Sequence, residues 1–179
     1  MNWTELLNAE ITGAYGAAEG LFDLVEDGEL GWKPEQGANW MTTGQLLQHV
    51  TEACGCCCAG FVTGDWKMPD GTDLKDVPPE EMMPPAEKMG AVDSVAKARE
   101  LLAADKAVAL QMVERAGEER LSSEKCSAPW MPGFEQPLGQ HLLQMVAHLN
   151  THKAQLYYYL KLQGKPVHTG HLYGMGSGC

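Results

Sequence analysis

The amino-acid sequence predicts an all-α protein, a four-helix bundle with a long crossover between its second and third helices. Apolar residues recur at steps of three and four in four separate stretches, which is the period of a helix that buries one face. No stretch shows the alternation of apolar and polar residues that is typical of a β-strand. A long proline-rich connection separates the second stretch from the third, as a crossover in a bundle requires.

The first helix is expected from about Trp3 to Val25, with Asn2 as its N-cap. Its buried face consists of apolar residues about one turn apart: Leu7, Ile11, Ala14, Tyr15, Ala18, Phe22 and Val25. The second helix is expected to begin near Thr43 and to reach Phe61. Its apolar face consists of Leu46, Leu47, Val50, Ala53, Cys57 and Phe61.

Residues 65–92 are expected to form a long connection that crosses from one end of the bundle to the other. They hold five of the ten prolines, and they carry three basic and seven acidic side chains. The third helix is expected to run from Asp93 or Ser94 to Gly117, and residues 118–136 are expected to form a loop.

The fourth helix shows the clearest pattern. It begins with Pro137 in its first turn, and Gly164 and Pro166 end it. Its apolar face includes Leu138, Leu142, Met145, Leu149, Leu156 and Leu160. Residues 165–179 then form a C-terminal tail, and the length of 179 residues predicts a single domain over residues 1–179.

The charge of the chain bears on its partners. The sequence has 13 basic and 24 acidic side chains, a net charge of −11. Such an excess repels phosphate backbones and anionic lipids, which argues against nucleic-acid and membrane partners. All 24 carboxylate side chains lie at or before Glu135, so residues 136–179 carry only Lys153, Lys161 and Lys165.

The cysteines and the N-terminus indicate a cytoplasmic protein. The N-terminal stretch carries Glu5 and Glu10 where a signal peptide has a basic region, and no apolar run is long enough for a membrane helix. Four of the six cysteines crowd into residues 54–58, a spacing that suits no ordinary disulfide framework. We expect Cys54, Cys56, Cys57 and Cys58 to be small, buried, free thiols.

Three histidines form a candidate metal site. His148 and His152 are four residues apart in the fourth helix, so their imidazoles leave the same face. His49 belongs to the apolar stripe of the second helix and is expected to point into the bundle. Three inward histidines with an open fourth position suit one divalent ion, Zn²⁺ or Ni²⁺. The alternative is that each histidine is a hydrogen-bonded core residue.

The sequence excludes two common metal architectures. No glutamate precedes a histidine by three residues, as ferritin-like di-iron bundles require. The metalloprotease motif His-Glu-x-x-His is also absent, since the fourth helix holds no carboxylate at all. A carboxylate general base must therefore come from an earlier segment. Glu52, one turn beyond His49, is the first candidate, and its alternative role is an ordinary solvated helix residue.

Aromatic residues mark a candidate pocket. Trp40 precedes the second helix, and Trp66 and Trp130 lie in the long loops, so they can form a pocket wall or cap the core. His141 lies two turns before His148, roughly 10 Å along the helix, which is too far to share an ion with His152. We assign it to the pocket. The last helix carries three consecutive tyrosines, Tyr157, Tyr158 and Tyr159, which together cover more than half of its circumference. At least one of them is therefore expected to be exposed or to lie at a homodimer contact.

The segment from His148 to Pro166 resembles the last-helix signature of the DinB/YfiT-like superfamily, whose usual form is His-x-x-x-His-Arg-Gly-Gln followed by an apolar stretch and Gly-x-Pro. In the second helix, a histidine after an apolar pair matches as Leu46-Leu47-Gln48-His49. The resemblance implies a four-helix bundle with a long crossover and one divalent ion held by His49, His148 and His152. Two features depart from the family: Lys153-Ala154 replaces Arg-Gly, and the cysteine cluster has no counterpart.

The resemblance also implies a class of reaction. Characterised members transfer low-molecular-weight thiols such as bacillithiol or glutathione, or isomerise maleylpyruvate with mycothiol, and dimers are common. We therefore expect a metal-dependent enzyme that acts on small molecules, with thiol S-transfer as the leading reaction and a low-molecular-weight thiol as cosubstrate. The alternatives are a metal-dependent hydrolase and a non-catalytic metal- or ligand-binding protein.

Overall fold

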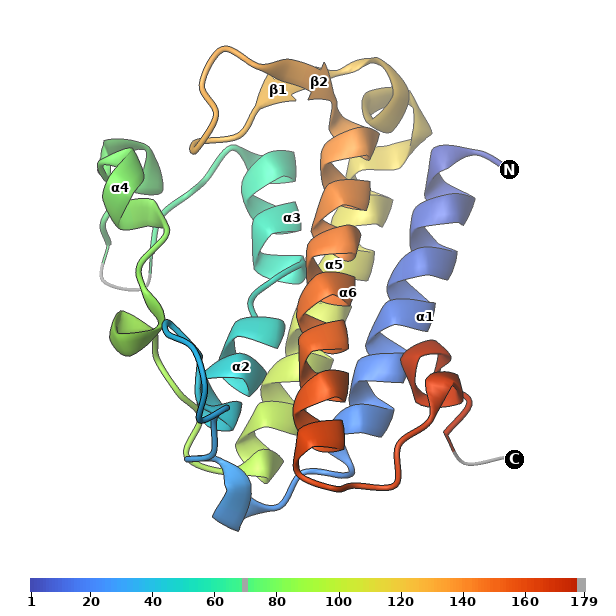
Figure 1. Ribbon diagram of the computed structural model, residues 1–179. Helices are drawn as coiled ribbons and strands as arrows, with labels where there is room; N and C mark the ends of the chain where they lie inside the picture. The colour runs from blue at the N-terminus through green and yellow to red at the C-terminus, as the bar shows by residue number, and fades with distance from the viewer. Residues whose placement is uncertain (69–70, 177–179) are drawn as a thin grey trace.

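The computed structural model describes residues 1–68 and 71–176, and its long helices pack side by side into a bundle (Figure 1). These helices are α1 (Trp3–Phe22), α2 (Thr43–Val50), α3 (Gly55–Thr63), α5 (Val95–Ser123) and α6 (Leu138–Leu162). Helices α1, α5 and α6 pack against one another, and α2 and α3 complete the bundle against α5 and α6. The predicted all-α, four-helix architecture is confirmed.

The core of the bundle is built from the apolar faces that the periodicity predicts. Large side chains of α1, α2, α5 and α6 are fully buried, among them Leu7, Ile11, Tyr15, Leu46, Leu102, Leu142 and Leu149. The predicted cap of α1 is also present. The side chain of Asn2 accepts a hydrogen bond from the Glu5 amide, and the Glu5 carboxylate accepts one from the Asn2 amide.

The second helix of the bundle is divided in two, which corrects the prediction of one helix from Thr43 to Phe61. Helix α2 ends at Val50, and α3 begins at Gly55. The buried carboxylate of Asp105 on α5 accepts hydrogen bonds from the amides of Gly55 and Cys56, at 2.9 and 2.8 Å. Asp105 thus caps the start of α3 from a neighbouring helix, and this cap stabilises a break that local sequence does not reveal.

The connection between α3 and α5 crosses from one end of the bundle to the other, beside α2 and α3 (Figure 1). It contains the short helix α4 (Pro79–Met82) and two single-turn 3₁₀ helices, Leu74–Asp76 and Ala86–Lys88. The side-chain amide of Gln45 donates hydrogen bonds to the carbonyls of Ala86 and Met89, and these bonds hold the end of the connection against α2.

The segment between α5 and α6 differs from the predicted loop over residues 118–136. Gly117, with a φ of 68° and a ψ of 165°, interrupts α5 at the predicted stop of the third helix, and a second helical stretch continues to Ser123. Strand β1 (Lys125–Ser127) then pairs antiparallel with β2 (Glu135–Pro137) and closes the end of the bundle where α6 begins (Figure 1). Each strand has only three residues, which is too short to show an alternating pattern in the sequence.

The remaining segments close the opposite end of the bundle. Asp27–Glu29 forms a 3₁₀ turn after α1, and Thr169–Tyr173 forms another that packs on α1 and α6. The ammonium group of Lys153 donates hydrogen bonds to the Asn150 side chain and to the Leu172 carbonyl, which attaches the tail to α6. Among the described residues, no helix is both long enough and apolar enough to cross a membrane.

The four clustered cysteines differ in exposure, which corrects the prediction that all are buried. Cys54 and Cys58 are fully buried in the core, whereas Cys57 is half-buried and Cys56 is exposed. Cys54 and Cys58 are one turn apart and share a buried face, whereas Cys56 lies off that face. All four thiols are free, as expected.

Candidate metal centre

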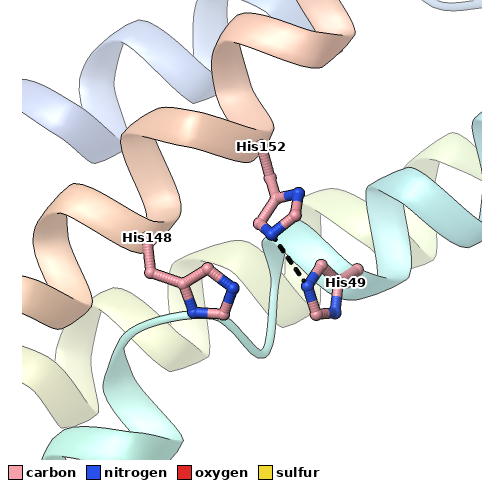
Figure 2. A group of neighbouring side chains, drawn as sticks. All are labelled: His49, His148 and His152. Carbon is pink, nitrogen blue, oxygen red and sulfur yellow. Dashed lines mark hydrogen bonds between the residues drawn. The ribbon is translucent and has the colours of Figure 1, made fainter. Parts of the chain in front are cut away.

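Three histidine side chains converge at the seam between α2 and α6 (Figure 2). His49 comes from the last turn of α2, and His148 and His152 come from consecutive turns of α6. One ring nitrogen from each histidine lies within 4.8 Å of the others. The ring centroids are separated by 4.2 Å for His49 and His152, 4.7 Å for His148 and His152, and 5.3 Å for His49 and His148.

Local structure explains why α2 presents His49 to α6. Helix α2 starts with a capping box, in which Thr42 and Gln45 exchange hydrogen bonds between side chain and backbone. Its fully buried residues include Leu46, Leu47 and Val50. These three anchor one side of the short helix in the core, and His49 lies at the edge of that side, half-buried and facing α6.

Hydrogen bonds orient two of the three imidazoles. The Gln155 side-chain oxygen lies 2.7 Å from Nδ1 of His152, so this nitrogen carries the proton and donates. Nε2 of His152 is then an acceptor, and it lies 3.0 Å from Nε2 of His49. His148 hydrogen-bonds the backbone carbonyl of Ala53, in the break between α2 and α3. Contacts of this kind fix the tautomer and the ring orientation of metal-binding histidines in other proteins.

All three histidines are neutral near pH 7. Burial, together with the neighbouring His152 and His148, lowers the pKa of His49 to about 4. Burial also lowers the pKa of His148 and of His152. Neutral imidazoles have a free lone pair and do not repel a cation, so the electrostatics favour metal binding.

The spacing of the nitrogens fits a divalent ion. With metal–nitrogen bonds of ~2.0–2.1 Å, two imidazole nitrogens on one ion are ~2.9–3.3 Å apart for bond angles between 90° and tetrahedral. The 3.0 Å between Nε2 of His49 and Nε2 of His152 lies in this range, and a ring nitrogen of His148 lies within 4.8 Å of both histidines. In the described part of the chain, the group of converging metal-ligand side chains contains these three histidines and no carboxylate.

Glu52, the candidate general base, lies in the break after α2 and is exposed. Its carboxylate accepts a hydrogen bond from the Gln48 side chain, and it does not join the group of three histidines. Helix α2 ends at Val50, but the Glu52 amide still donates a hydrogen bond to the His49 carbonyl at 3.1 Å, so Glu52 remains about one turn beyond His49. A role of Glu52 in catalysis stays a prediction.

A small cavity of about 70 Å³ lies on α6 about one turn from the histidines. Its lining residues are Ala128, Trp130, Met131, Phe134, Gln136, His141, Gln144 and Met145. Two of the pocket residues predicted from the sequence, Trp130 and His141, are among them. Gln144 connects the two features, since it lines the cavity and precedes His148 by four residues on the same face of α6.

The other predicted pocket residues lie behind the cavity or elsewhere. Trp66 packs edge-to-face on Trp130 and on Phe61, so it supports the cavity wall from behind. Trp40 packs against Tyr159, near the far end of α6, and donates its indole N–H to the Gln36 carbonyl. The structure therefore brings Trp66 and Trp130 together and leaves Trp40 outside this group.

His141 has a structural environment that differs from that of the three converging histidines. Its Nε2 lies 2.8 Å from the Cys126 carbonyl, and its Nδ1 lies 3.1 Å from the Gln136 amide nitrogen. Both ring nitrogens are thus occupied, and the ring stacks on Phe61. His141 forms part of the cavity wall and fastens the β-hairpin to α6. As the sequence predicts, it does not join the metal-type cluster.

Sequence analysis missed several residues that shape the centre: Ala53, Asp105, Gln136, Gln144 and Gln155. The resemblance to the superfamily signature includes Gln155, but neither spacing nor composition assigned it a role. The others act through contacts between segments far apart in the chain, which no local pattern reveals.

The fold and the centre together define an α-helical bundle with a three-histidine group that can hold a metal ion. The DinB superfamily model matches residues 10–156, so the chain belongs to the DinB superfamily. The matched range includes His49, His148 and His152, and it confirms the resemblance found in the sequence. No curated protein and no solved structure matches the chain.

Proposed function

We propose that this chain is a metal-dependent enzyme that transfers a low-molecular-weight thiol to a small electrophile. The observation that carries the proposal is the group of three neutral histidines beside a small, aromatic-lined cavity. The donor set of three imidazoles suits a borderline divalent ion, Zn²⁺ or Ni²⁺. Such an ion, when bound, lowers the pKa of a coordinated thiol or water.

The residues of the chain have distinct roles in this proposal. His49, His148 and His152 hold the ion, while Gln155 and the Ala53 carbonyl keep two of the rings in the binding orientation. The three-histidine set leaves at least one position open toward a substrate, as in catalytic rather than structural zinc sites. A closed fourth position supplied by the protein would instead favour a non-catalytic metal-binding protein.

The cavity beside the centre offers apolar surface to an electrophile, and its volume of about 70 Å³ admits only a small group. Trp130, Met131 and Phe134 provide apolar and aromatic surface. The Gln136 and Gln144 side chains hydrogen-bond each other at 2.6 Å and present amide groups at the same cavity. A substrate with one planar or apolar portion and one polar group thus has partners for both.

The lack of a carboxylate in the described histidine group favours thiol transfer over hydrolysis. A free thiol has a pKa of ~8.5 and water one of ~15.7, so a thiol needs far less help from a base to form its nucleophile. Hydrolysis is the second candidate, and it would depend more strongly on a positioned base such as Glu52.

The test combines a thermal-shift screen with an activity assay. Metal-free protein is titrated with Zn²⁺, Ni²⁺ and other divalent ions, and then with cellular thiols and an electrophile such as a chloro-aromatic compound. We expect one ion to raise the melting temperature and thiol conjugation to require that ion. Stabilisation by an ion without conjugation or hydrolysis would indicate a non-catalytic binding protein, and no stabilisation by any ion or thiol would contradict the proposal.

A further inference from the structure

A second group of metal-ligand side chains, separate from the histidines, lies at the start of α3. It consists of four free thiols within five residues: Cys54, Cys56, Cys57 and Cys58. We propose that Cys56 and Cys57 form a binding site for a soft, thiophilic metal ion, of which Cu⁺ is the example we test. Thiolate sulfur is the ligand that selects such ions, whereas imidazole suits the borderline ions of the histidine centre.

The distance between the two sulfurs suits a shared ion. Sγ of Cys56 lies 3.9 Å from Sγ of Cys57. Two thiolates on one ion with metal–sulfur bonds of ~2.3 Å are ~3.8 Å apart at the tetrahedral angle and ~4.0 Å apart at the trigonal angle. The observed separation falls between these values, so an ion can bridge the pair with little movement of the side chains.

Exposure to solvent distinguishes Cys56 and Cys57 from the second pair of thiols, Cys54 and Cys58. Cys54 and Cys58 also approach each other, with 4.0 Å between their Sγ atoms, but both are fully buried. Cys56 is exposed and Cys57 is half-buried, so an ion can reach them from solvent without opening the core.

The backbone that carries the two thiols is already fixed. The Asp105 carboxylate accepts hydrogen bonds from the Gly55 and Cys56 amides, and it also accepts one from the Tyr15 hydroxyl. This network ties the first turn of α3 to α1 and α5. An ion that binds Cys56 and Cys57 therefore does not have to order a flexible loop, which lowers the entropic cost of binding.

The charges around the thiols favour a cation over a free thiolate. The hydrogen bond between the two thiols raises the pKa of Cys56 and lowers that of Cys57, while the carboxylates of Asp105 and Glu52 act to raise the pKa of both. Negative neighbours that oppose an uncompensated thiolate attract a metal cation. When the ion binds, the two S–H bonds break, two protons go to solvent and two metal–sulfur bonds form, with no change of oxidation state.

The test is a Cu⁺ titration of the reduced full-length protein under nitrogen, with a coloured chelator as competitor. We expect about one equivalent of tight binding, and X-ray absorption of the copper should show sulfur neighbours at ~2.3 Å. Cys56→Ser with Cys57→Ser should weaken this binding at least ~100-fold. Cys126→Ser and Cys179→Ser, which change cysteines outside the cluster, serve as matched controls and should bind as the parent does.

A further variant separates this site from the histidine centre. His148→Ala should keep the sulfur-bound copper, even though it disrupts the histidine group. Because Cys56 is exposed, the single variant Cys56→Ser is expected to fold and provides the same test without the half-buried position. The proposal would be overturned by equal Cu⁺ affinity in the parent and in Cys56→Ser, or by copper that has only nitrogen neighbours.

Discussion

Gln155 shows how one side chain outside the histidine group can control it. Its carboxamide oxygen accepts from Nδ1 of His152, which leaves Nε2 as the nitrogen with a lone pair toward His49. Without this hydrogen bond, the His152 ring can rotate or adopt the other tautomer. A fraction of the molecules then no longer has the Nε2 lone pair of His152 directed toward His49. The metal affinity of the centre should therefore depend on a residue that never touches the ion.

The first prediction concerns this contact. Gln155→Ala should lower the affinity for Zn²⁺ or Ni²⁺ ~10–100-fold and leave the fold intact, because the residue only orients His152. Competition with a chromophoric chelator measures the affinity. Gln163→Ala, at the end of the same helix, is the matched control and should bind as the parent does. Unchanged affinity in Gln155→Ala would show that His152 is held by other means.

The second prediction concerns pH and the metal-free protein. Burial lowers the pKa of His49 to about 4, whereas an unfolded histidine titrates near ~6.5. Between these two pKa values, His49 is protonated in more of the unfolded chains than of the folded ones. His49 therefore lowers the free energy of unfolding as the pH falls from ~6.5 toward ~4. Above ~6.5, His49 is neutral in both states and contributes no pH dependence.

Urea unfolding of the parent and of His49→Ala across this range measures the effect. The difference in unfolding free energy between the two proteins should change by less than ~1.4 kcal/mol per pH unit, because the half-buried ring is partly screened by solvent. The parent should lose stability relative to the variant as the pH falls. His168→Ala, in the exposed tail, should follow the parent, and a parallel course of parent and His49→Ala would disprove the assigned shift.

At the scale of elements, the break between α2 and α3 is the feature that positions the centre. It places the Ala53 carbonyl against His148, and it depends on Asp105, which caps α3 from α5. The sequence shows an unbroken apolar stripe from Leu46 to Phe61, so periodicity alone predicts one helix. A cap that comes from fifty residues away leaves no local signal, and this is why the prediction was wrong here.

The third prediction tests this break. Gly55 packs so closely on Asp105 that an added Cβ would overlap its backbone oxygen. Gly55→Ala should therefore destabilise the protein by ~2 kcal/mol or more, since the helices must move apart. Gly13→Ala in α1 is the control, because a Cβ there meets no atom within 4 Å.

The control variant Gly13→Ala should raise the free energy of unfolding by up to ~1 kcal/mol through helix propensity alone. Thermal or urea unfolding of both variants measures the two effects. Destabilisation by Gly55→Ala together with stabilisation by Gly13→Ala would support the close packing at Gly55. Stabilisation by both substitutions would contradict it. Gly55→Ala should also weaken metal binding, because it shifts the segment that carries Ala53.

Other elements show what a sequence can and cannot predict. Helix α6 was predicted closely, because its apolar period, Pro137 at the start and Gly164 at the end are all local signals. The stop at Gly117 was predicted, but the helical stretch that follows it to Ser123 was missed. The exposure of Cys56 was also missed.

At the scale of the whole molecule, the uneven distribution of carboxylates along the chain bears on the role of α6 in the bundle. All carboxylate side chains precede Gln136, and α6 carries none. Helix α6 packs against α1, α2, α3 and α5, so its inward face is part of the core. Because α6 has no carboxylate, its histidines are its candidate metal ligands, and this restriction follows from the amino-acid sequence alone.

The convergence of His49 with His148 and His152 was predicted from the stripe position of His49 and from the superfamily signature, and the structure brings these side chains together. The cavity was predicted only in part, because its walls come from the β-hairpin, α6 and their contacts. Long-range packing therefore determined the cavity, whereas local pattern was enough to predict the three-histidine group.

The most direct test of the central claim is the metal content of the purified protein and of His152→Ala, measured by elemental analysis after loading with Zn²⁺ or Ni²⁺ and removal of free ions. The parent and the tail variant His168→Ala should each retain about one ion per chain. His152→Ala should retain almost none, while its circular dichroism shows the same helical content. Retention of a stoichiometric ion in His152→Ala would contradict the assignment of the three-histidine centre.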